Sequence, residues 1–134
     1  EDCRFGVNGV NIGLFCSTPM VALSRNVANK HAMEMLLTGD MIPAARAAEM
    51  GLLNRSVVPE ALQDEVMGVA RKIASKSSLT LATGKRAFYA QREMPLAEAY
   101  AHASRVMVEN MLAQDAVEGI GAFVEKRAPV WVDA

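Results

Sequence analysis

Residues 32–53 read AMEMLLTGDMIPAARAAEMGLL, which is the pattern of two helices separated by a tight turn. Apolar residues recur at helical spacing before the turn, so we expect a helix over about residues 29–38. Gly39 then occupies the position where a helix commonly ends in the left-handed conformation. A short second helix is expected to begin near Ala44 and to be stopped by Gly51. This stretch therefore predicts a helical layer.

Residues 1–16 are the only part of the chain with an extended, glycine-punctuated character. The pattern predicts a short strand near Phe5–Val7, followed by a loop. Ser17 or Thr18 is expected to cap the next helix, whose first turn contains a proline. A second short strand is expected over Leu53–Val58, where apolar residues precede a proline.

Four further helices are expected downstream of residue 60. Ser77 or Ser78 is expected to cap the second of them, which runs to about Gln91, and Pro95 is expected to be the first residue of the third. The first and third each carry an apolar stripe at helical spacing. The stripes are Leu62, Val66, Val69, Ala70 and Ile73 in the first, and Leu96, Tyr100, Ala103, Met107 and Met111 in the third.

The last expected helix opens with Asp115 and Glu118, which have the spacing of a capping box with aspartate as the cap. Its apolar face is formed by Val117, Ile120 and Val124, and a proline lies beyond its end. The whole pattern predicts a mostly helical chain with few, short strands. Periodicity alone specifies no reaction.

Composition excludes several classes of function. Among 134 residues, 14 are Lys or Arg and 15 are Asp or Glu, so the net charge of −1 argues against a nucleic-acid partner. No apolar stretch approaches the roughly 18 residues that suggest a membrane span. The two cysteines and two histidines have neither C-x-x-C nor H-E-x-x-H spacing, so no metal site is expected. No signal-peptide pattern opens the chain.

Three segments, in order, resemble the enoyl-CoA hydratase/isomerase family, the crotonases. They are residues 5–14 (FGVNGVNIGL), residues 32–53 and residues 115–131 (DAVEGIGAFVEKRAPVW). The resemblance implies an α/β fold class, of which this chain is the C-terminal, mostly helical part of a ClpP/crotonase-like fold with a strand remnant at its start. It further implies that residues 1–16 end the spiral core and that residues 17–134 form the helical trimerisation region.

The chain opens without methionine, and its first residues resemble the middle of a domain. We therefore expect a piece of a longer protein, in which the preceding half carries the two oxyanion-hole amides and the first catalytic glutamate. No turnover is expected from the 134-residue piece alone. For the complete protein, the resemblance implies hydration of trans-2-enoyl-CoA in fatty-acid metabolism, through stabilisation of an enolate-like anion. Coenzyme A is part of the substrate, and no other cofactor is implied.

The family's second glutamate position holds Gly9 in this chain, and an alternative acid position holds Ser17. No Asp or Glu occurs between Asp2 and Glu34, so shifting the alignment does not supply a carboxylate. A one-glutamate hydratase, an isomerase and an acyl-CoA binder all stay open. The alternative to an active enzyme is a catalytically impaired acyl-CoA-binding or assembly subunit.

The resemblance implies that Phe123 and Lys126 approach coenzyme A, often that of a neighbouring subunit. We expect both to bind substrate, with Ser17 as a further candidate. Lysine suits phosphate as a point charge, and an aromatic ring can cover an acyl pocket or an adenine face. Each residue also has a plainer interpretation. Gly9 is then a turn glycine, Ser17 is a helix cap, and Lys126 and Arg127 are ordinary surface charges.

Cys16 is interpreted as a small buried hydrophobe, because its only candidate histidine partners, His31 and His102, fall inside expected helices. The resemblance also implies a homo-oligomer, either a trimer or a hexamer. The expected compartment is the cytoplasm, or the mitochondrial matrix in a eukaryote.

Overall fold

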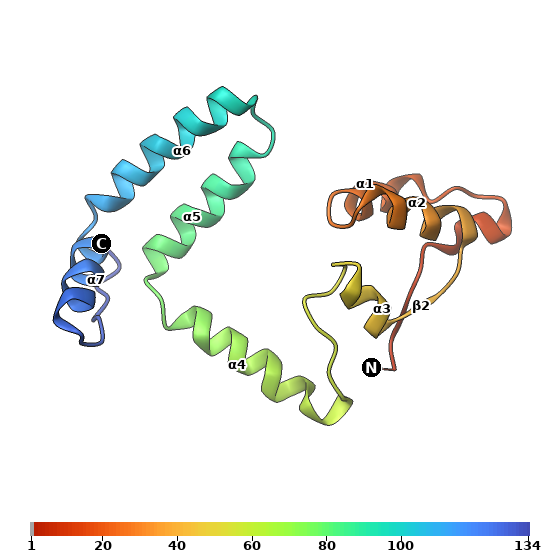
Figure 1. The fold of residues 1–134 in the computed structure, drawn as a ribbon, viewed down its shortest axis with the longest axis horizontal. Coiled ribbons are helices and arrows are strands. Elements are labelled where there is room, and N and C mark those ends of the chain that lie inside the picture. Colours follow the sequence, from red (N-terminus) through yellow and green to blue (C-terminus); the bar gives the residue numbers. More distant parts are fainter. Residues whose placement is uncertain (1) are drawn as a thin grey trace. The chain divides into compact units, whose positions relative to one another are not determined.

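The computed structural model describes residues 2–134 and divides into two compact units. The first unit extends to Glu65, and the second begins at Val66 and ends at Ala134. Helices dominate both units, as Figure 1 shows along the chain. The expected α/β character is confirmed, since a small sheet accompanies the helices.

The first unit contains the only sheet among the described residues, formed by two short strands. Strand β1 (Arg4–Phe5) pairs in antiparallel register with β2 (Ile42–Pro43), so that Phe5 lies opposite Ile42. Its helical elements are η1 (Asn8–Ile12), α1 (Ser17–Ser24), α2 (Asn29–Thr38), α3 (Ala44–Glu49) and η2 (Pro59–Ala61). The helix over 29–38 and the short helix from Ala44 are confirmed, while the strand expected near Phe5–Val7 is found at Arg4–Phe5.

The strand expected over Leu53–Val58 was a wrong prediction, because this segment forms turns and irregular chain. The backbone N–H groups of Leu52 and Leu53 both donate to the carbonyl oxygen of Ala47, at 2.9 and 3.2 Å. The chain therefore folds back on the end of α3 where the strand was expected to begin. The partner of β1 is instead Ile42–Pro43, which lies in the turn between the two helices of the 32–53 stretch.

The core of the first unit is a cluster of buried apolar side chains: Leu23, Val27, Ala32, Met35, Leu36 and Met50. Gly39 ends α2 in the left-handed conformation, with φ of 65°. A Cβ at this position would lie 2.7 Å from Oδ1 of Asn11 and 2.9 Å from Cγ1 of Val10. The Asn11 side chain also donates a hydrogen bond to the Gly39 carbonyl at 3.2 Å. Glycine is therefore required both by the backbone angle and by the close approach of η1.

The second unit is built from α4 (Leu62–Ala74), which begins just before the unit boundary, and from α5 (Ser78–Gln91), α6 (Leu96–Met111) and α7 (Gln114–Glu125). Helix α5 packs on α6, and α7 contacts both. Ser77 caps α5 as predicted, because its hydroxyl oxygen accepts a hydrogen bond from the N–H of Thr80 at 3.1 Å.

Three predicted helix starts need correction. Pro95 directly precedes α6 instead of opening it, a shift of one residue. Cys16 precedes α1, and neither Ser17 nor Thr18 caps it with a side chain. Asp115 lies inside the first turn of α7, which Ala113 precedes, so the predicted capping box was wrong. Its carboxylate instead binds residues that follow the helix.

The predicted apolar stripes of α4 and α6 exist as faces but remain exposed in the described chain. The exposed stripe residues include Leu62, Val66, Val69 and Ile73 in α4, and Leu96, Tyr100, Met107 and Met111 in α6. Burial of such side chains normally drives helix packing, at roughly 1.5–3 kcal/mol for each fully buried residue. The helices were therefore predicted correctly, but the sequence did not predict what packs against these faces.

We expect the substitution Gly39→Ala to lower the free energy of unfolding more than Gly13→Ala. Both glycines have positive φ, 65° and 78°, which costs a residue with a Cβ about 1 kcal/mol. A Cβ at Gly13 meets no atom within 4 Å, whereas one at Gly39 meets Asn11 and Val10. Overpacking of this kind costs roughly 1–3 kcal/mol more. Urea unfolding of the two variants measures the difference, and equal losses would contradict the close approach of η1.

Candidate functional site

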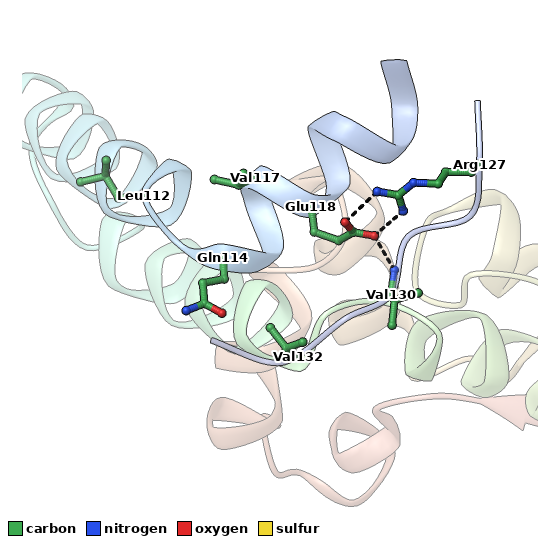
Figure 2. A pocket seen from close by; sticks show the side chains of 7 residues that line it. All are labelled: Leu112, Gln114, Val117, Glu118, Arg127, Val130 and Val132. Carbon is green, nitrogen blue, oxygen red and sulfur yellow. Dashed lines mark hydrogen bonds and ion pairs between the residues drawn. The ribbon is translucent and has the colours of Figure 1, made fainter. Parts of the chain in front are cut away.

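A polar cluster joins α7 to the residues that follow it. The guanidinium of Arg127 donates to both carboxylate oxygens of Glu118, at 2.6 and 2.9 Å, and its Nε donates to Glu125 at 2.6 Å. Glu118 also accepts a hydrogen bond from the backbone N–H of Val130 at 2.8 Å. Figure 2 shows Glu118 between the guanidinium and the Val130 backbone. Two-pronged pairing of this kind fixes geometry as well as charge.

These contacts change the acid–base properties of both partners. The hydrogen bonds from Arg127 and from the Val130 backbone lower the pKa of Glu118 from 4.5 to about 2. The same carboxylate, together with that of Glu125, raises the pKa of Arg127 above its already high ordinary value. Both side chains are therefore charged across the whole physiological range.

Segment 128–134 runs back along α7 and is held at further points. The buried carboxylate of Asp115 accepts hydrogen bonds from the N–H groups of Val132 and Asp133, at 2.8 and 3.1–3.2 Å. The carboxylate of Asp133 accepts from the N–H of Ser78 at 2.7 Å, at the start of α5. Bonding to Ser78 lowers the pKa of Asp133.

Trp131 anchors the same segment. Its indole N–H donates to the carbonyl oxygen of Ser75 at 2.9 Å. Its ring also lies over Gly119, where an added Cβ would be 3.3 Å from two ring atoms. The glycine next to Glu118 thus allows the indole to approach α7 closely. Segment 128–134 ties α7 to the junction of α4 and α5.

Helix α7 ends in a turn at Lys126, one of two predicted ligand contacts in this unit. Lys126 adopts the left-handed conformation, with φ of 56° and ψ of 38°. Its N–H donates to the carbonyl of Phe123 at 3.3 Å, and that of Arg127 to the carbonyl of Ala122 at 3.0 Å. This is the bond pattern of a Schellman motif, in which the left-handed residue is usually glycine. Here the residue carries a long cationic side chain.

Phe123 lies one turn before Lys126 and is 84% exposed. Lys126 is also exposed, and within the described chain no ion pair involves it. Their predicted role as ligand contacts stays a prediction. The structure places both at the C-terminal end of α7, available to a ligand.

An open hollow of about 620 Å³ lies beside the polar cluster (Figure 2). Its lining is mostly apolar, with the Glu118–Arg127 pair as its charged part. The lining residues are Leu112, Gln114, Val117, Glu118, Arg127, Val130 and Val132. Neither Phe123 nor Lys126 lines it, so the hollow and the predicted ligand contacts are separate features of α7.

Gly9 and Ser17 lie in the first unit, around the entry to α1. The N–H of Gly9 donates to Sγ of Cys16 at 3.3 Å, and its carbonyl accepts from Leu14 at 3.0 Å. A Cβ on Gly9 would lie 2.6 Å from the carbonyl oxygen of Leu14 and 2.7 Å from Sγ of Cys16. Gly9 is thus packed against the loop that follows it. Any side chain there requires that loop to shift.

The neighbouring candidates have structural partners. The hydroxyl of Ser17 donates to the carbonyl of Phe15 at 3.3 Å. Cys16 is half-buried against the apolar core of the first unit. His31 lies in α2 and His102 in α6, as expected. No group of described His, Cys, Asp and Glu residues has a metal-binding arrangement, and no described helix is long and apolar enough to cross a membrane.

Comparison with known proteins decides the family. A family model described as enoyl-CoA hydratase/isomerase matches residues 1–134. The chain belongs to the enoyl-CoA hydratase/isomerase family. The crotonase resemblance drawn from three sequence segments is therefore confirmed over the full length of the chain.

Curated relatives include enoyl-CoA hydratase domain-containing protein 3, mitochondrial, from two mammals. The human protein is 53% identical over 132 residues, covering 98% of this chain and 43% of that protein. The Rattus norvegicus protein is 50% identical over 131 residues, covering 98% and 44%. The chain thus spans less than half the length of these relatives.

Solved structures give the same result for the fold. A Mycobacterium smegmatis enoyl-CoA hydratase superposes with a TM-score of 0.93 at 51% identity, covering 97% of this chain and 51% of that one. Human enoyl coenzyme A hydratase domain-containing protein 3 gives 0.89 at 50% identity, covering 96% and 51%. The predicted fold class, a mostly helical part of a crotonase fold, is confirmed.

The residues that sequence reasoning missed are those that bind segment 128–134. Asp115 and Glu118 were assigned to a helix cap, and Arg127 was regarded as a surface charge. The signal was present as two acids three residues apart on one helix face, followed nine residues after Glu118 by an arginine. That pattern equally fits a helix whose acidic side chains bind the chain segment that follows the helix.

We expect segment 128–134 to detach from α7 as the pH falls from about 4.5 to about 2. The pKa of Glu118 is lowered by docking, so its contribution is complete above its ordinary pKa of 4.5 and is lost as pH falls through about 2. Trp131 is the single tryptophan, and its emission reports the docked state.

The matched variant is Glu118→Gln, which cannot ionise at this position. Its emission at pH 7 should already be shifted toward that of exposed tryptophan, and its acid transition should be reduced. An acid titration identical to that of the unaltered protein would show that Glu118 does not hold the segment.

Proposed function

We propose that the complete protein binds acyl-CoA thioesters, stabilises an enolate-like anion and hydrates trans-2-enoyl-CoA in fatty-acid metabolism. The observation that carries the proposal is the family match over the entire chain, which includes the intact C-terminal motif. The name of the Mycobacterium smegmatis structure, an enoyl-CoA hydratase, supports the same activity.

The chemistry divides between this chain and the part of the relatives that it does not span. The resemblance assigns to that other part the two backbone N–H groups that face the thioester oxygen. Donors aimed at developing negative charge usually supply the largest catalytic effect. The residues described here would contribute chiefly to holding the coenzyme A portion of the substrate, and no additional cofactor is proposed.

Lys126 and Phe123 are the proposed contacts for coenzyme A. The ammonium of Lys126 is exposed on a left-handed turn and suits a phosphate as a point charge. The ring of Phe123, at 84% exposure, suits an adenine face or the acyl chain. Ser17, whose hydroxyl donates to the backbone carbonyl of Phe15, is a further candidate contact.

A homo-oligomer, trimer or hexamer, is proposed for the complete protein. The exposed apolar faces of α4 and α6 support it, because large contiguous apolar surfaces usually mark sites of association. The mitochondrial names of the curated relatives support the matrix as the compartment in a eukaryote, with the cytoplasm as the counterpart in a bacterium.

The second candidate function is a catalytically impaired acyl-CoA-binding or assembly subunit. Gly9 stands where the resemblance places a glutamate, and its Cβ position is blocked by the Leu14 carbonyl at 2.6 Å. No carboxylate occurs between Asp2 and Glu34 to replace it. General acid–base work at this locus would therefore depend on a group outside these residues.

The activity is tested with the complete protein and trans-2-butenoyl-CoA. Hydration removes the conjugation between the double bond and the thioester. The ultraviolet absorbance should therefore decrease much faster with the protein than in buffer alone. A buffer-level rate combined with tight binding of the saturated butanoyl-CoA would favour the binding subunit instead. A buffer-level rate with no binding would overturn both.

The substitution Gly9→Glu should not raise this rate, and it should lower stability. The Cβ alone clashes with both the Leu14 carbonyl oxygen and the Cys16 sulfur, so Gly9→Ala should already lose roughly 1–3 kcal/mol of unfolding free energy. Gly9→Ala separates the cost of the Cβ from any effect of the carboxylate. A Gly9→Glu protein of ordinary stability and higher turnover would contradict the packing seen at this residue.

A further inference from the structure

Lys126 is an unusual residue for its place in the backbone. A left-handed conformation costs a residue with a Cβ about 1 kcal/mol relative to glycine, and strained residues persist where their surroundings determine them. Asp133, the other non-glycine residue with positive φ in the described chain, is of a type that tolerates this conformation. Lysine has no such local advantage. The structure around Lys126 must therefore supply the constraint.

The side chains on either side of Lys126 are joined to each other. Nε of Arg127 lies 2.6 Å from the Glu125 carboxylate, so the two neighbours close a bridge across the turn. The same guanidinium reaches back to Glu118 with two bonds, and Glu118 holds the N–H of Val130 beyond the turn. The backbone before and after Lys126 is thus fixed to α7 by one side chain.

Arg127 also controls the charge around the turn. Glu118, in the first half of α7, and Glu125, its last residue, both pair with the Arg127 guanidinium. Without it, both carboxylates would lose this ion-pair partner, and Glu125 directly precedes Lys126 in the chain. With it, no described carboxylate forms an ion pair with Lys126. The ammonium is left available for an anion from outside the chain.

We infer that Arg127 is a positioning residue, which holds the Lys126 turn and occupies Glu118 and Glu125 so that the Lys126 ammonium is presented to the phosphates of a coenzyme A thioester. This inference rests on the proposed function, because it takes the ligand from it. It adds that recognition of the phosphates depends on a residue that does not touch them.

The test compares two thioesters of the same saturated acyl group, butanoyl-CoA and butanoyl-pantetheine, which lacks the phosphates. In calorimetry on the complete protein, the Arg127→Met variant should bind butanoyl-CoA at least tenfold more weakly than the unaltered protein does. This is the loss expected when one contact to a charged group is removed. Its affinity for butanoyl-pantetheine should change by less than twofold. A general structural defect would weaken both ligands alike.

Three further variants make the result specific. Arg71→Met removes the same charge from the last turn of α4 and should leave both affinities unchanged. Arg127→Lys keeps the charge but not the two-pronged geometry. Its affinity for butanoyl-CoA should lie between those of the unaltered protein and Arg127→Met. The double variant Arg127→Met with Lys126→Ala should bind butanoyl-CoA no more weakly than Lys126→Ala alone, because the two substitutions remove the same interaction.

The outcomes separate the inference from the proposed function. If the unaltered protein binds neither thioester, the proposed function fails. If it binds butanoyl-CoA and Lys126→Ala weakens that binding, but Arg127→Met and Arg127→Lys do not, the inference is overturned. If Arg127→Met loses affinity equally for both thioesters, and its Trp131 emission is shifted toward that of exposed tryptophan, Arg127 has a structural role only.

Discussion

The pairing of Arg127 with Glu118 is the contact that joins α7 to the chain that follows it. It closes the end of α7, fixes the turn at Lys126 and begins the docking of segment 128–134. Asp115 then binds that segment to α7, and Trp131 anchors it at the junction of α4 and α5. The ion pair itself is solvent-exposed, and exposed pairs add little to stability. Its contribution is geometric, because it determines where the residues on either side of it point.

Helix positions followed from the sequence because apolar periodicity, capping serines and helix-ending glycines act locally. The helix over residues 29–38, its end at Gly39 and the cap at Ser77 all depend on near neighbours. The capping box at Asp115 failed for the opposite reason. Two acids three residues apart suit either a helix start or a returning chain, and only the fold of residues 128–134 decides between them.

The candidate site was accessible to prediction only in part. Resemblance to the crotonases indicated Gly9, Ser17, Phe123 and Lys126, but it carried no geometry. That Gly9 has no room for a Cβ depends on the Leu14 carbonyl, which lies five residues away, just beyond the end of η1. That the Arg127 guanidinium pairs with both Glu118 and Glu125, while no described carboxylate pairs with Lys126, depends on how the chain turns at the end of α7. Neither relationship can be read from residue types or spacing.

The central claim is that the turn at Lys126 contacts the coenzyme A portion of an acyl-CoA thioester. A crystal structure of the complete protein with bound butanoyl-CoA tests this most directly. The predicted result is a Lys126 Nζ about 2.7–2.9 Å from a phosphate oxygen, with Arg127 still paired to Glu118. A bound ligand whose phosphates are held by other residues, with Lys126 directed into solvent, would contradict the account.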